Sequence, residues 1–341
     1  MCFFTSSDIR GNLLTAERIR ALKAIREQER VTLVTTFDAL MNTMAPIEKM
    51  WENVLTLEQG QLLDLKEIQA ALIRMGYEKE YQVQTMGQFS VRGGILDVFP
   101  LTEENPIRIE LWGDEIDTIR YFDCESQKSI ENTDRVSIYP AAELVLSDEE
   151  KAGGIEKLKA EAKRVSDKLR KQMKTEEAHR VTVMADELTE EWGELSMYAG
   201  MDAFLSYFFD ERVGLLDYFK PSDSLIFFDE LTRCVEQGKL TETEFSESMK
   251  QRLAMGYILP GQMNGLFTEK EIVAKLEKYS CIALGALDNK ANGLHQLGSY
   301  GIHCQSVSPY NNSFELLIKD LKRYKKNGYR VILLSGSRTR A

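Results

Sequence analysis

Histidine and cysteine are scarce in this chain of 341 residues, which has three histidines and five cysteines. No two cysteines form a CxxC pair, and so few histidines leave a zinc site without its usual ligands. His179, His295 and His303 have no acidic or cysteine neighbour at the spacing of a metal site or a catalytic triad. We therefore expect no metal centre, and reduced thiols in the cytoplasm.

Long hydrophobic runs and an excess of positive charge are also absent. No apolar stretch reaches the roughly 18 residues of a membrane span. The first residues, MCFFTSSDIRG, lack the basic start and apolar middle of a signal peptide. The formal net charge is −11, whereas binding to free nucleic acid usually needs a basic face. We expect no membrane contact and weak binding to DNA, although a negative net charge still allows a local basic patch.

Ordinary globular segments fill the chain, with 43% hydrophobic and 28% charged residues. Residues 12–30 have helical spacing, and 31–40 predict a buried strand that passes into a short helix. Residues 221–230, PSDSLIFFDE, predict another strand of parallel-sheet character. Near the end, an amphipathic helix should stop at Gly328, before a strand at 331–334. This order indicates an α/β protein, and we interpret the chain as a fragment of a longer one.

Between these α/β segments the sequence pattern changes. The helix around LKEIQAALIRMG should end at Gly76, and residues 81–140 are short, alternating and turn-punctuated, as β-structure is. Residues 148–175 then predict a long charged helix, whose charges are typical of a solvated face.

The strongest enzymatic pattern is LIFFDE, in which Asp229 and Glu230 follow an apolar strand. Nucleotide hydrolases place a magnesium-binding aspartate there, but they also need a GxxxxGK[ST] loop, and this sequence has none. We expect no catalytic residue, no cofactor and no enzyme activity in this chain. Asp229 and Glu230 are then acids in a loop at a sheet edge, a relic of an ATPase site, or half of a site.

Two further motifs could indicate phosphate or DNA binding, but a structural role explains each of them better. The glycines of RGG, residues 92–94, are followed by strand-like ILDVF rather than by a helix, so a bend or bulge in a sheet is expected. The basic run KRYKKNGYR lies where a helix would end, and positive charge is favourable there.

Strict alternation in PIRIELWGDEID is the most informative pattern. In a strand, alternate residues share a face. The core face should hold Ile107, Ile109 and Leu111. The other face should hold Arg108, Glu110 and Trp112. A two-residue Gly113-Asp114 turn would set Glu110 opposite Asp117, an unfavourable pair, so the register stays open.

Tryptophan and arginine on one exposed face are the residue types of interface hot spots. Arg92, on the preceding strand, is placed to join them. A cation–π pair that covers the sheet is the alternative. If Arg108 and Trp112 are exposed contacts, alanine at either should weaken binding with little effect on the melting temperature.

The stretches FSVRGGILDVFP, RIELWGDEID and FDCESQ, in this order, resemble the UvrB-homologous module of the bacterial transcription-repair coupling factors (Mfd). The resemblance implies a degenerate RecA-like domain of the P-loop-hydrolase type, split by an inserted β-rich domain that binds UvrA. Residues 1–50 and 141–300 would be the two parts of the split domain. Residues 51–140 would be the insert, and 301–341 the start of a further α/β domain.

The resemblance also implies site residues and partners. By motif, the residues that bind UvrA are Arg92, Arg108 and Trp112. The aromatic is often phenylalanine in the family, so Trp112 is a departure. ATP, magnesium, RNA polymerase, double-stranded DNA and translocation would belong to other domains of a full-length protein. The alternative is a UvrB-type ATP-dependent repair helicase subunit.

Overall fold

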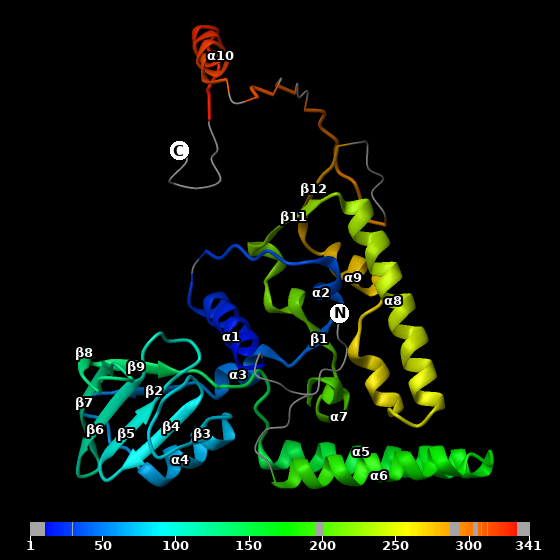
Figure 1. Ribbon diagram of the computed structural model, residues 1–341. Coiled ribbons are helices and arrows are strands. Elements are labelled where there is room, and N and C mark those ends of the chain that lie inside the picture. The colour runs from blue at the N-terminus through cyan, green and yellow to red at the C-terminus, as the bar shows by residue number, and fades with distance from the viewer. Residues whose placement is uncertain are drawn as a thin grey trace. The chain divides into compact units, whose positions relative to one another are not determined.

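The computed structural model describes residues 11–28, 30–194, 201–286, 293–302, 306–307, 309–311 and 313–332 (Figure 1). The chain divides into two compact units, Met1–His295 and Gln296–Ala341. Within the described residues, no helix is both long and apolar enough to cross a membrane.

Residues 78–133 of the first unit contain a six-stranded sheet, with the strand order β3-β4-β5-β6-β7-β8. Its strands are β3 (Glu78–Lys79), β4 (Gln88–Arg92), β5 (Ile95–Val98), β6 (Ile107–Trp112), β7 (Glu115–Phe122) and β8 (Ser129–Thr133). β3 pairs with β4 in parallel, and the other neighbours are antiparallel. A second antiparallel pair joins β2 (Leu55–Glu58) to β9 (Arg135–Ile138). The predicted β-rich character of residues 81–140 is confirmed.

Helix α4 (Leu65–Arg74) covers one face of this sheet (Figure 1). Ile68 and Leu72 of α4 pack in one core with Leu96, Ile107 and Ile109 of the strands. Each such side chain contributes roughly 1.5–3 kcal/mol when it is fully buried. The core face predicted from alternation is therefore confirmed for the two isoleucines.

The ends of α4 follow from its sequence. The Asp64 carboxylate accepts hydrogen bonds from the backbone N–H groups of Lys66 and Glu67, which caps the first turn. Gly76 follows the C-cap residue Met75 and has φ +90°, a left-handed conformation that glycine adopts without strain. The predicted helix end at Gly76 is confirmed.

Two long helices, α5 (Asp148–Lys171) and α6 (Thr175–Glu194), pack against each other and against α7 (Leu205–Phe208). α5 begins at a capping box, in which Ser147 and Glu150 satisfy each other's backbone N–H groups. The charged helix predicted at 148–175 is confirmed over 148–171, where α5 ends. Trp192 is fully buried here, with the Phe204 ring 5.1 Å away.

The α/β elements of the first unit pack around two further cores. One core holds side chains of α1 (Gly11–Glu27) and α3 (Ile47–Glu52). The other holds side chains of α2 (Phe37–Met41), β11 (Leu225–Asp229), α8 (Leu231–Ala254), α9 (Glu269–Leu276) and β12 (Ser280–Leu284). β1 (Thr43–Met44) pairs antiparallel with β10 (Val213–Gly214). Short 3-10 helices lie at Met201–Phe204, Leu215–Tyr218, Pro221–Asp223 and Pro260–Gly265.

The parallel strand predicted at 221–230 is confirmed, because β11 pairs in parallel with β12. The strand predicted within 31–40 is wrong: residues 31–36 form no strand, and only the short helix α2 is present. A β-branched run forms a strand only where a neighbour supplies hydrogen bonds, and Val34 is 90% exposed. The structure thus shows α/β character with a two-stranded parallel sheet. The split RecA-like domain remains a prediction.

The second unit contains α10 (Phe314–Lys326), which the sequence predicted. Gly328 follows it with φ +79°, so the predicted end of the helix is confirmed. Of the strand expected at 331–334, the first two residues are not in a strand, and the last two lie outside the described residues.

Candidate partner-binding face of the sheet

The face of the six-stranded sheet opposite its core carries the residues that the sequence singled out. Directly opposite residues on antiparallel strands point to the same side. One row joins Arg92, Ile95, Glu110 and Thr118. The next row joins Asp97, Arg108 and Arg120. Because alternate residues share a face, Trp112 belongs to this side too. We call it the polar face.

A two-residue turn places Arg92 at the end of β4. Gly93 and Gly94 connect β4 to β5, and Gly93 has φ +61°. The Gly94 carbonyl accepts a hydrogen bond of 2.8 Å from the Leu111 N–H. A Cβ atom at Gly94 would lie 3.2 Å from the Leu111 carbonyl oxygen, so the close approach of the strands favours glycine. The expected bend or bulge is wrong, since RGG forms a tight hairpin turn.

Asp97 joins the two arginines. Its Oδ1 accepts from Arg108 Nε at 2.7 Å. Its Oδ2 accepts from Arg108 Nη2 at 2.8 Å and from Arg92 Nη2 at 2.9 Å. The Asp97 side chain is 2% exposed, so these charge-assisted bonds replace the water that a buried carboxylate has lost.

Arg108 is largely buried, although the sequence placed it on an exposed face. Its side chain is 13% exposed, against 37% for Arg92. The guanidinium lies 4.3 Å from the centre of the Phe122 ring and donates a 2.8 Å bond to Gln127 Oε1. The hydrogen bonds to Asp97 raise the pKa of Arg108 above its usual value, against an opposing effect of burial. The expectation of exposure is therefore wrong for Arg108, because Asp97, Phe122 and Gln127 surround it.

A bulge resolves the register that the sequence left open. Trp112 pairs with Glu115 across the predicted Gly113-Asp114 turn, which is confirmed. The register then shifts, so Glu110 faces Thr118 rather than Asp117. Thr118 Oγ1 donates to Glu110 at 3.3 Å, and Arg120 forms an ion pair with the same carboxylate. The unfavourable acidic pair is thereby avoided.

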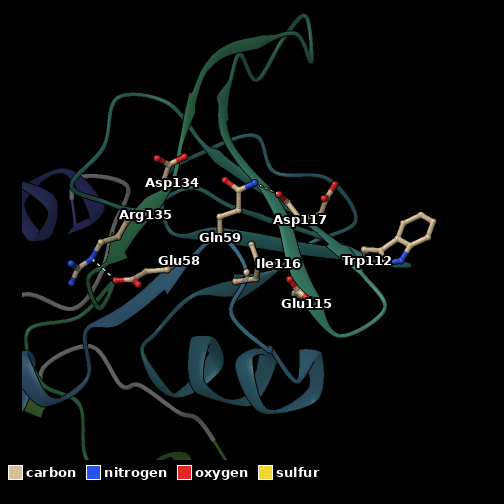
Figure 2. Close-up of a pocket in the computed structure, with 9 residues that line it drawn as sticks. Glu58, Gln59, Trp112, Glu115, Ile116, Asp117, Asp134 and Arg135 are labelled. Atoms are coloured by element: carbon tan, nitrogen blue, oxygen red, sulfur yellow. Dashed lines mark hydrogen bonds and ion pairs between the residues drawn. The ribbon is translucent and has the colours of Figure 1, made fainter.

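Trp112 is 84% exposed and lies at the rim of an open hollow of about 700 Å³. The hollow is lined by Glu58, Gln59, Gly60, Trp112, Glu115, Ile116, Asp117, Asp134 and Arg135. Figure 2 shows the indole ring pointing away from the other labelled side chains. An ion pair of 3.2 Å joins Arg135 to Glu58. A ring this exposed gains most by docking into a partner's pocket.

Sequence reasoning missed Asp97, Gln127 and the hollow. A signal for Asp97 was present, because a carboxylate interrupts the apolar strand ILDV and must find a partner. No local pattern pointed to Gln127, which reaches Arg108 from the turn between β7 and β8. The hollow combines residues of β2 with the β6–β7 hairpin, and a single strand's alternation does not reveal that proximity.

Asp229 and Glu230 lie where β11 meets α8. Glu230 has φ +56°, and its side chain accepts a 2.9 Å hydrogen bond from the Ala286 N–H. Among the residues that the structure describes, no cluster of three or more histidine, cysteine or acidic side chains is arranged to hold a metal. The three interpretations of these acids drawn from the sequence stay predictions.

Two comparisons show which known proteins this chain is similar to. Residues 55–144 match the model of the UvrB interaction domain. The chain is 28% identical over 327 residues to a transcription-repair-coupling factor of Bacillus subtilis (strain 168), covering 96% of the chain and 27% of the relative. A transcription-repair-coupling factor of Staphylococcus haemolyticus is 26% identical over 334 residues, with the same coverage. The chain therefore spans 27% of the length of these relatives. The resemblance drawn from the sequence motifs is confirmed.

Proposed function

We propose that this chain acts in transcription-coupled DNA repair by binding UvrA through the polar face of its six-stranded sheet. The observation that carries the proposal is the position of Arg92, Arg108 and Trp112. All three lie within the residues that match the UvrB interaction domain, and on one face of it. In a full-length protein, this contact would recruit UvrA to a stalled RNA polymerase.

The three residues differ in what they offer a partner. Trp112 offers a large exposed apolar ring, and Arg92 offers a guanidinium on a side chain that is 37% exposed. Arg108 is mainly held inside the sheet face. We therefore assign the direct contacts to Trp112 and Arg92, and a mainly supporting role to Arg108. Because guanidinium groups match carboxylates, the surface of UvrA that meets Arg92 should be acidic.

We also propose that this chain does not hydrolyse ATP, since its 341 residues contain no GxxxxGK[ST] loop. ATP and magnesium binding, translocation on double-stranded DNA and contact with RNA polymerase would then belong to other domains of a full-length protein. The expected cytoplasmic location is part of the same proposal.

A binding measurement tests the proposed contact. UvrA is immobilised, and the parent chain, Trp112→Ala and Arg92→Ala are passed over it. The matched controls are Ile73→Ala and Arg74→Ala, which change exposed residues of α4 on the opposite side of the sheet. We expect the parent and both controls to bind equally, and both polar-face variants to bind more weakly. A parent chain that does not bind UvrA would overturn the proposal.

A further inference from the structure

Asp97 is an unusual residue for the interior of a sheet face. Its carboxylate is almost completely buried, and a buried ion pair is often no more stabilising than apolar residues of similar volume. Stability alone therefore gives little reason for a carboxylate here. Its contacts indicate another role, because the carboxylate accepts three hydrogen bonds from arginines of the polar face.

These bonds fix the two guanidinium groups in different ways. Arg108 meets Asp97 with two nitrogens, a bidentate arrangement that sets the plane of the group. Arg92 meets it with Nη2 only, so its Nε and Nη1 atoms remain able to donate to a partner. Two guanidiniums and one carboxylate leave one net positive charge on this cluster. A carboxylate is the group that fits it best.

Gln127 holds Arg108 from the other side. Its Oε1 accepts from Arg108 Nη2 at 2.8 Å, and its own Nε2 donates to the Cys124 carbonyl at 2.8 Å. Gln127 has φ +58°, a conformation that is uncommon for residues other than glycine. Such local strain is often found at functional sites. The turn that presents Gln127 is itself tied down, since Asp123 accepts from both the N–H and the hydroxyl of Ser126.

We propose that Asp97 and Gln127 are positioning residues for the partner contact: together they fix the supporting Arg108, and Asp97 holds Arg92 in the binding orientation before a carboxylate of UvrA arrives. This inference rests on the proposed function. An arginine side chain loses much rotamer freedom when it is fixed in a complex. Here the arginines lose this rotamer freedom when the domain folds, so the entropic cost of ordering them on binding is smaller.

A double-mutant cycle separates positioning from a purely structural role. Binding to immobilised UvrA is measured for the parent, Asp97→Asn, Arg92→Ala and the double variant. Asp97→Asn keeps the shape of the side chain and removes its charge. We expect it to weaken binding about tenfold in the parent, but only about threefold when Arg92 is already alanine. If Asp97 only supports the fold, it should cost the same factor in both backgrounds.

A second variant keeps the proposal testable if Asp97→Asn does not fold, which circular dichroism would reveal. Gln127→Ala removes one acceptor of Arg108 and lies on a surface turn. We expect it to weaken binding about threefold, whereas Gln69→Ala on α4 should bind like the parent. The inference is overturned by equal costs of Asp97→Asn in both backgrounds. If Asp97→Asn does not fold, binding of Gln127→Ala at the parent level overturns it. In either case, a parent that still binds UvrA leaves the proposed function intact.

Discussion

Replacement of Arg108 by alanine should destabilise the sheet domain strongly. The change leaves Asp97, whose side chain is 2% exposed, with Arg92 as its remaining ion-pair partner. Removing one member of a buried ion pair typically costs 3–5 kcal/mol. Arg92 still neutralises part of the charge, so we take the lower end, about 3 kcal/mol. For a domain the size of residues 55–144, this corresponds to a fall of roughly 12–24 °C in melting temperature.

This result would differ from the small change in melting temperature expected from the sequence alone. The difference arises because Arg108 is packed on Phe122 and bonded to Asp97 and Gln127. Differential scanning calorimetry of the whole chain measures it. The matched control is Arg74→Ala on α4, which removes an exposed arginine and should leave the melting temperature within a few degrees of the parent.

A rescue experiment tests the cause of the instability. If the unpaired carboxylate is responsible, Arg108→Ala combined with Asp97→Ala should be more stable than Arg108→Ala alone, because no buried charge remains without its partner. Arg92 would then extend into water, since it is already 37% exposed. The reasoning fails if Arg108→Ala melts with the parent. It also fails if adding Asp97→Ala lowers the melting temperature further.

Three other outcomes are expected. Trp112→Ala should bind UvrA about thirtyfold more weakly, or about 2 kcal/mol, if it is a central hot spot; its melting temperature should match the parent because the ring is 84% exposed. Calorimetric titration of the chain with magnesium-ATP should be flat, and micromolar binding would contradict this expectation. Fluorescence anisotropy at 150 mM salt should show weak binding to duplex DNA, given the net charge of −11; nanomolar affinity would show that a basic patch was misjudged.

The polar face shows how far alternation carries from sequence to structure. Alternation requires only that successive residues of a strand point to opposite sides, and it correctly placed Arg108 and Trp112 on one face. Exposure is a different property, because it depends on what other strands place beside each residue. Arg108 is enclosed by Asp97 of β5 and Phe122 of β7. Trp112 is the last residue of β6, beside the turn, and is exposed to solvent.

Pairing partners limited the other predictions in the same way. The β-branched run at 31–36 has strand propensity, yet none of these residues forms a strand in the structure. The run LIFFD in β11 has similar propensity and pairs with β12, a strand more than fifty residues later. The local sequence therefore predicts strand propensity, but a strand forms only where a second strand supplies hydrogen bonds.

The burial of Arg108 changes how mutations on this face must be interpreted. A loss of UvrA binding in Arg108→Ala would combine a lost contact with a destabilised sheet, because the same guanidinium serves Asp97. Trp112 has no comparable role in the core, and Arg92 reaches Asp97 through one nitrogen only. Direct contact is therefore best judged from Trp112→Ala and Arg92→Ala, whose effects on binding are least confounded by folding. Arg108→Lys distinguishes the two roles of Arg108 further, because it retains a positive charge near Asp97 but not the bidentate geometry. If Arg108 mainly positions and supports its neighbours, this variant should recover part of the stability lost in Arg108→Ala while its affinity for UvrA stays below that of the parent.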